Sequence, residues 1–170
     1  MSRRKNKFVT PLWVVAGFGS GALRMGIISG QSAGNNQPFG KERVVGARNF
    51  CNKLWNIARF VEDKVGDDFK EKKSSPANAK AATAADHWVL SKLQQFSREI
   101  ASLLDEYRFA EAYDRLYHLI WDEVADWYIE TSKVMATPGM MAYTLETILK
   151  LAHPFAPFVT ETIWQTFQTD

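Results

Sequence analysis

Apolar residues recur every three or four positions over most of this 170-residue chain, and this spacing constrains the fold more than any other feature. One such series is Phe50, Leu54, Ile57 and Val61. Residues at this spacing share one side of an α-helix, whereas strands alternate apolar and polar residues, a pattern that is nearly absent. The sequence therefore predicts an all-α chain whose helices bury their apolar sides against one another.

The same spacing, and the residues that interrupt it, predict where the helices lie. We expect a short helix at about 19–29 and long helices at about 41–63, 84–106 and 109–133. Thr137, Pro138 and Gly139 precede a helix that ends at His153, and Pro154 and Pro157 lead into a last helix ending near Phe167. Residues 1–18, 30–40 and 66–79 are expected to be irregular. The prediction is an antiparallel bundle of five or six helices. Its buried positions should include Val89, Leu93, Phe96, Ile100 and Leu103 in one helix, and Phe109, Leu116, Ile120, Val124 and Trp127 in the next.

Composition excludes several classes of protein. Hydrophobic residues make up 46% and charged residues 24%, a globular balance, and no apolar run approaches the roughly 20 residues of a membrane helix. The apolar stretch after the basic start is short and contains Pro11, which argues against a secretory signal. Cys51 is the only cysteine, and no Cys/His cluster has zinc-ligand spacing. We therefore expect a cytoplasmic protein without a metal or a cofactor.

Charge is distributed unevenly along the chain. Residues 1–64 hold eleven Lys or Arg against three acids, a net +8, whereas residues 65–170 hold ten against sixteen, a net −6. An anionic partner should therefore prefer the first third of the chain. The alternative is a solvated basic face without a partner.

The first long helix carries a polar side opposite its apolar one. At 100° per residue, Arg48, Asn49, Asn52, Asn56 and Arg59 fall within a sector of about 100°. Asparagine is a mediocre helix former, so three of them on one face call for a reason beyond solubility. Amides suit base edges and guanidinium groups suit phosphates, which favours an RNA-binding face. The alternative is an ordinary polar outer face.

Three segments together resemble the anticodon-binding domain of valyl-tRNA synthetases, which are class I enzymes. The first, RVVGARNFCNKLWNIARFV (43–61), is similar to the family pattern G-x-R-N-F-x-N-K-L-W-N-x-x-R-F. The segments YRFAEAYDRLYHLIWDEVADWYIETSK (107–133) and LKLAHPFAPFVTETIWQTF (149–167) resemble the family's two later blocks, in the same order. The resemblance implies a helical bundle of the class Ia synthetase type that binds the anticodon stem and loop of a tRNA.

The resemblance also implies partners and site residues. The expected partner is a valine tRNA, with a synthetase catalytic domain as a further candidate. Asn52 and Asn56 would face anticodon bases, and Arg48, Lys53 and Arg59 would face phosphates, with Trp55 beside a base. The acids Asp126 and Glu130 belong to a structural block of the family. The full set of expected RNA-binding residues is Arg43, Arg48, Asn49, Asn52, Lys53, Trp55, Asn56 and Arg59.

The first 24 residues are similar to the synthetase stretch that begins at the signature K-M-S-K-S. The first lysine of that signature is absent, and Ser2 is followed by Arg3 and Arg4 where the family has lysine and serine. The H-I-G-H motif that adenylate formation also needs is absent. We therefore expect no catalytic residue and no ligase activity from this chain alone. We expect residues 1–40 to be a partly irregular remnant of this segment, and residues 41–170 to form the helical domain.

Two other hypotheses stay open at the level of sequence. The chain could be a stand-alone paralogue that has lost tRNA binding and serves as a helical protein-interaction module. The altered signature segment is the observation that favours this hypothesis. The chain could also be a folded but idle fragment that has lost tRNA binding.

Overall fold

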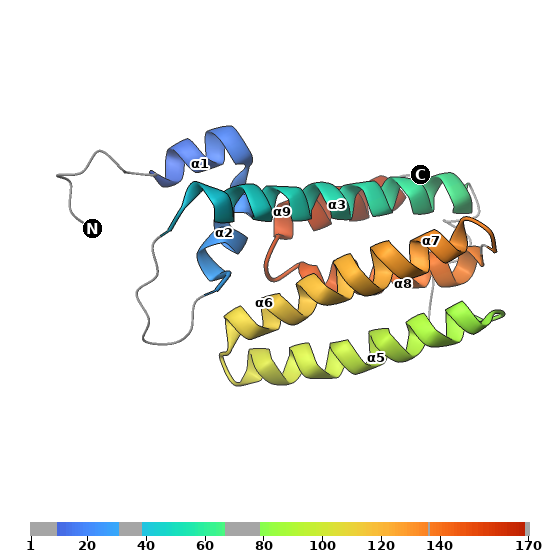
Figure 1. Ribbon diagram of the computed structural model, residues 1–170. Coiled ribbons are helices and arrows are strands. Elements are labelled where there is room, and N and C mark those ends of the chain that lie inside the picture. Colours follow the sequence, from blue (N-terminus) through green and yellow to red (C-terminus); the bar gives the residue numbers. More distant parts are fainter. Residues whose placement is uncertain (1–9, 31–38, 67–78, 136, 169–170) are drawn as a thin grey trace.

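The computed structural model describes residues 10–30, 39–66, 79–135 and 137–168, which form a bundle of helices without a strand in these ranges (Figure 1). The long elements are α3 (Lys41–Val65), α5 (Ala84–Asp105), α8 (Pro138–Ala152) and α9 (Pro157–Gln168). A continuous helical run comprises α6 (Phe109–His118), the π-helix η2 (Leu119–Tyr128) and α7 (Ile129–Ser132), and two short helices, α1 (Pro11–Phe18) and α2 (Ser20–Ile28), precede α3. The predicted all-α bundle is confirmed.

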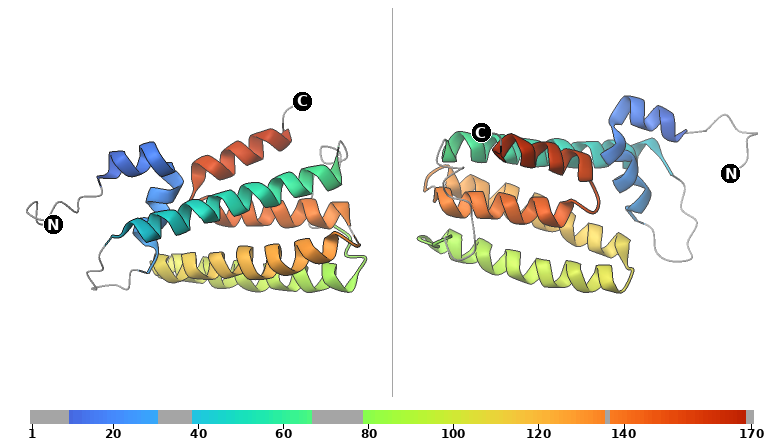
Figure 2. Two further views of the ribbon diagram at one scale, coloured as in Figure 1. Left: turned by 45° about the horizontal axis from the view of Figure 1, so that its top comes forward. Right: turned by 180° about the vertical axis from the view of Figure 1, so that it is seen from behind.

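The helices lie roughly side by side in three tiers (Figures 1 and 2). α3 and α9 form one side, α5 forms the opposite side, and α8 and the α6–α7 run lie between them. α8 packs against α3, α5 and α9, and η2 packs against both α3 and α5. The outer side of α3 is therefore left uncovered by the other long helices, and η2 stands between α3 and α5.

Most of the predicted buried positions are confirmed. Phe50, Leu54, Ile57 and Val61 are buried, as are Val89, Leu93, Phe96 and Ile100, while Leu103 is half-buried. Two positions in the run from α6 to α7 were predicted wrongly, because Phe109 is 47% exposed and Trp127 is 66% exposed.

The π-helix explains the position of Trp127. The i→i+5 hydrogen bonds of a π-helix put more residues in each turn than an α-helix has. Steps of four therefore keep to one side of η2, so the buried series continues from Ile120 through Val124 to Tyr128. If this segment were an α-helix, Trp127, three residues after Val124, would also point into the core. Phe109 has a simpler reason, since it is the first residue of α6 and packs edge-on against the exposed Tyr107.

Residues 11–18 are helical, although the sequence pattern favoured an irregular segment up to residue 18. Pro11 does not prevent this helix, because it occupies the first turn of α1, where proline lacks only an N–H that would be unpaired anyway. Thr10 caps this helix, because its hydroxyl accepts a hydrogen bond from the Trp13 N–H at 3.3 Å. Val14 is fully buried. The expected loops at 30–40 and 66–79 lie largely outside the described residues.

The short helix α2 is tied to the bundle across the predicted boundary at residue 40. Arg24 donates to the backbone carbonyls of Phe155 (3.3 Å) and Pro154 (3.0 Å), at the corner between α8 and α9. At the crossing with α3, a Cβ on Gly21 would lie 3.2 Å from the Cys51 sulfur. The division into 1–40 and 41–170 stays a prediction, and α2 packs on α3 across it.

A buried carboxylate joins the start of α5 to two other elements. Asp86 is 1% exposed and accepts from the N–H groups of Ala82 and Thr83, the Thr137 hydroxyl and the Tyr128 hydroxyl, at 2.7–3.0 Å. Burial alone would raise the pKa of Asp86, but these hydrogen bonds outweigh it and hold the pKa below its usual value. The carboxylate therefore fixes Tyr128 of η2 against α5.

Candidate nucleic-acid interface

The uncovered side of α3 presents polar side chains to solvent. Arg48, Asn49, Asn52, Asn56 and Arg59 are all exposed, on the side opposite the buried apolar series. Within the described part of the chain, the side chains of Asn52, Asn56 and Arg59 make no hydrogen bond or ion pair. Arg48 donates to the Asn49 side-chain oxygen at 3.3 Å. Arg48 also lies 5.6 Å from the centre of the Phe18 ring of α1. We call these five residues the α3 polar face; the side chains of Asn52, Asn56 and Arg59 are available to an external ligand.

Lys53 lies at one edge of the α3 polar face, beside η2. Its Nζ is 3.2 Å from Oδ1 of Asp126 and 4.9 Å from the centre of the Trp121 ring. Trp121 in turn stacks on Tyr117, with ring centres 5.4 Å apart and planes at 10°. The sequence predicted that Lys53 faces a phosphate. In the structure it is half-buried between a carboxylate and an indole.

A second lysine has the same surroundings on the other side of η2. Lys92 of α5 is 2.8 Å from Oε1 of Glu123 and 5.7 Å from the centre of the Trp88 ring. Each of the two helices that flank η2 thus contributes a lysine that pairs with a carboxylate of η2 and lies over a tryptophan. Two acids of η2, Glu123 and Asp126, are therefore partners of lysines on neighbouring helices.

Trp55 lies at the other edge of the α3 polar face, and Arg43 lies off this face. Trp55 is 39% exposed and lines a shallow hollow between α3 and α9, together with Arg59 of the α3 polar face and Phe167. Arg43 is two helical turns before Phe50, on the buried side of α3, and donates to the Ser29 carbonyl at 3.0 Å. The geometry gives Arg43 a contact that joins α2 to α3. Ser2, Arg3 and Arg4 lie outside the described residues.

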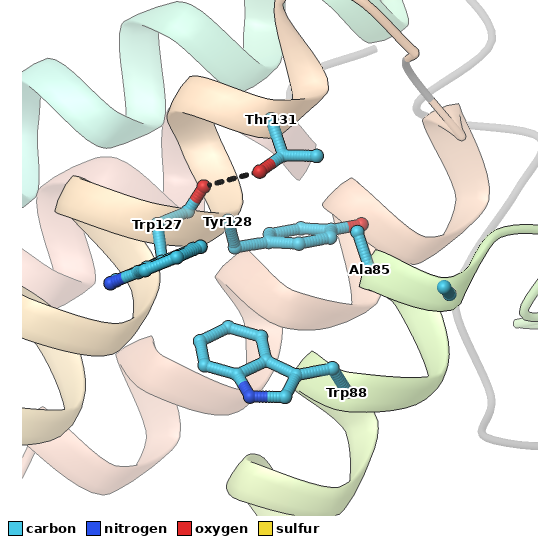
Figure 3. A pocket seen from close by; sticks show the side chains of 6 residues that line it. Ala85, Trp88, Trp127, Tyr128 and Thr131 are labelled. Atoms are coloured by element: carbon cyan, nitrogen blue, oxygen red, sulfur yellow. Dashed lines mark hydrogen bonds between the residues drawn. The ribbon is translucent and has the colours of Figure 1, made fainter.

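Sequence reasoning missed an aromatic pocket between α5 and the end of the α6–α7 run. Trp88, Trp127 and Tyr128 stand on three sides of one hollow (Figure 3). The Trp88 and Trp127 ring centres are 6.2 Å apart with planes at 47°, and the cavity measures about 350 Å³. The consecutive aromatics Trp127 and Tyr128 were a usable signal, because two adjacent side chains of one helix cannot both point straight into the core. The six lining residues are Ala84, Ala85, Trp88, Trp127, Tyr128 and Thr131.

The cysteine and two of the histidines have contacts that fit structural roles. Burial raises the pKa of the half-buried Cys51 thiol to about 11, which keeps it protonated at neutral pH. His118 pairs with Asp122 on its own helical run at 2.6 Å, and His153 lies 2.9 Å from the Thr160 hydroxyl at the α8–α9 corner. No group of three or more His, Cys, Asp or Glu in the described ranges could hold a metal ion. Nor does any helix in those ranges have the length and apolarity needed to cross a membrane.

Comparison with known proteins identifies the bundle. Residues 86–170 match the family described as the anticodon-binding domain of tRNA ligase. This chain belongs to that family. The chain is 38% identical to part of the valine–tRNA ligase of Staphylococcus epidermidis and 36% identical to part of that of Staphylococcus aureus, each over 98% of this chain. The resemblance to valyl-tRNA synthetases that the three sequence blocks predicted is therefore confirmed.

The chain spans 20% of the length of these two ligases, and what it matches is their anticodon-binding part. A solved structure, the agnB2 LeuRS of Agrobacterium radiobacter K84 in a ternary complex with tRNA and LeuAMS, superposes with a TM-score of 0.80. That superposition covers 100% of this chain and 21% of the LeuRS chain at 16% identity, so it shows the fold alone. The family match includes the whole aromatic pocket except Ala84 and Ala85, whereas α3 is covered by the alignment to the valine–tRNA ligases.

Proposed function

We propose that this anticodon-binding domain binds the anticodon stem and loop of a valine tRNA through the α3 polar face. The observation that carries the proposal is the set of exposed amides and guanidinium groups on the outer side of α3, in a chain of this family. Its contribution to aminoacylation is positioning, as part of or beside a catalytic body in the cytoplasm. Residues 1–40 are, in this proposal, what remains of the segment that follows the catalytic signature.

The side chains of the α3 polar face divide into two roles. Arg48 and Arg59 carry fixed positive charge and suit phosphates, so they supply affinity for any tRNA. Asn52 and Asn56 each present a donor and an acceptor and suit base edges, so they supply preference for one anticodon. Since none of these side chains is buried, binding requires no rearrangement of the core.

Substitutions on the α3 polar face test the proposal by equilibrium binding to a valine-tRNA transcript over a series of salt concentrations. Arg48→Ala or Arg59→Ala should weaken binding to every tRNA and lower the salt slope by about 0.7 to 0.9. Asn52→Ala or Asn56→Ala should instead reduce the preference for the valine anticodon by roughly 1–3 kcal/mol, a scale taken from base contacts in DNA. Arg98→Ala, at an exposed arginine of α5, is the control. The proposal fails if the Arg48 and Arg59 variants bind like this control.

A specific observation favours the rival function of a protein-interaction module. α1 exposes three large apolar side chains, Leu12 (82%), Trp13 (47%) and Val15 (41%). Such a surface is typical of a protein contact. This rival predicts that the parent protein binds no tRNA transcript at low salt. Substitutions on the α3 polar face would then have no RNA binding to change.

A further inference from the structure

The aromatic pocket between α5 and η2 has the features of a ligand site. Its lining residues in the described part of the chain are alanine, aromatic and threonine, none of them charged. Its volume of about 350 Å³ lies in the range that holds a small planar ligand. Trp127 is 66% exposed at its mouth, and Trp88 and Tyr128 form its inner walls (Figure 3). A flat, uncharged ring can stack on Trp127 and bury its edge against these walls.

The backbone of η2 points to the same place independently. Trp127 faces solvent because Leu119–Tyr128 is π-helical, and α-helical geometry would turn this indole inward. π-helical turns are less favourable than α-helical ones and are frequent at functional sites. At the same time Asp86 anchors the adjacent Tyr128 through a hydrogen bond of 3.0 Å from its hydroxyl. The exposed Trp127 indole therefore lies on a π-helical segment, and the residue after it, Tyr128, is held in place by Asp86.

The cations around η2 indicate what kind of ring would bind. Trp127 directly follows Asp126, the partner of Lys53 on α3, and faces Trp88, whose ring lies beneath Lys92 of α5. Aromatic surfaces between lysines are typical of sites for single-stranded RNA, in which bases stack and phosphates meet the cations. Asp126, which pairs with Lys53 at an edge of the α3 polar face, directly precedes Trp127, so η2 lies between that face and the pocket.

We propose that this pocket receives one unpaired nucleobase of the RNA loop that the α3 polar face holds. The base stacks on Trp127, and the indole of Trp88 closes the pocket below it. This inference rests on the proposed function and extends it to a second contact, on a different pair of helices. Recognition by stacking tolerates any base, so the pocket contributes affinity for an exposed loop rather than for one sequence.

The test uses the full chain and a valine-tRNA transcript that carries 2-aminopurine at one anticodon-loop position at a time. Trp127→Ala should weaken binding about 5- to 150-fold, the range of one lost base stack, without changing the salt slope. Trp127→Phe should restore much of the affinity, because a ring remains. In the parent, 2-aminopurine at one loop position should be quenched, and this quenching should disappear in Trp127→Ala.

The controls separate the pocket from the proposed function. Phe158→Ala removes another aromatic side chain that is 64% exposed, on α9, and should bind like the parent. If Arg59→Ala weakens binding while Trp127→Ala does not, the pocket inference is overturned and the function of the α3 polar face stands. If the parent binds no transcript at low salt, both are overturned. Self-association that Trp127→Ala abolishes, without an effect on RNA binding, would also overturn the inference and make the pocket a protein contact.

Discussion

The ion pair between Lys53 and Asp126 should restrain RNA binding, and Asp126→Asn should release it. A phosphate at Lys53 would compete with the Asp126 carboxylate for the lysine ammonium group, and that carboxylate would repel the phosphate. The two side chains are 29% and 54% exposed, so their pair is worth at most about 1 kcal/mol in the free protein. Asp126→Asn should therefore raise affinity for any tRNA by up to about fivefold at low salt.

Salt dependence and a matched variant make this prediction specific. The released Lys53 adds one phosphate contact, so the salt slope should steepen by about 0.7 to 0.9, and the gain should fade at high salt. Glu146→Gln is the control, because it also removes one negative charge and frees a lysine, Lys150, at a contact of 2.5 Å on α8. Binding of a valine-tRNA transcript is measured by fluorescence anisotropy from low to high salt.

Two results would refute this reasoning. Equal gains for Asp126→Asn and Glu146→Gln would mean that overall charge, and not Lys53, sets the affinity. Weaker binding by Asp126→Asn would mean that Asp126 holds Lys53 in the orientation in which it binds RNA.

Three further predictions concern the fold. Asp86→Asn should lower the free energy of unfolding by about 1–3 kcal/mol in urea titrations, because it disturbs the hydrogen bonds of a buried acceptor. Since the folded pKa of Asp86 is depressed, this contribution is present above the unfolded value of about 3.9, and the gap between parent and variant should narrow as the pH falls below about 4. Tyr107 has φ 59° in the turn after α5, so Tyr107→Gly should stabilise the protein by up to about 1 kcal/mol in the same titrations; a loss would show that its ring contact matters more. Cys51, with its pKa raised to about 11 by burial, should react with iodoacetamide far more slowly at pH 7.5 than a free thiol does, and equal rates would contradict its packing.

The sequence predicted the helices and their buried sides because one physical rule, apolar residues at helical spacing, governed them. It failed where the backbone departs from that rule. Because of the π-helical turns of η2, Tyr128 is buried and Trp127 is exposed, the reverse of what α-helical spacing predicts. No single-sequence pattern marks such turns. The helix at 11–18 was missed because proline ends a helix in its interior yet favours its first turn, and Thr10 caps the helix that Pro11 begins.

The candidate site was predictable to the extent that it lies on one helix. Helical spacing was enough to group Arg48, Asn49, Asn52, Asn56 and Arg59 on one side of α3, and the structure leaves that side exposed. Contacts between helices could not be read in this way. The pairing of Lys53 with Asp126 joins residues 73 positions apart, and the pocket depends on Trp88 of α5 meeting Trp127 of η2.

The central claim is that this anticodon-binding domain reads a valine anticodon, and an anticodon-exchanged tRNA tests it most directly. The dissociation constant of the parent chain is measured for a valine-tRNA transcript and for the same transcript with only its three anticodon bases changed. The account predicts weaker binding to the changed transcript, with the same salt slope for both, because the phosphate contacts are shared. Equal affinity for the two transcripts at every salt concentration, or no binding to either at low salt, would contradict it.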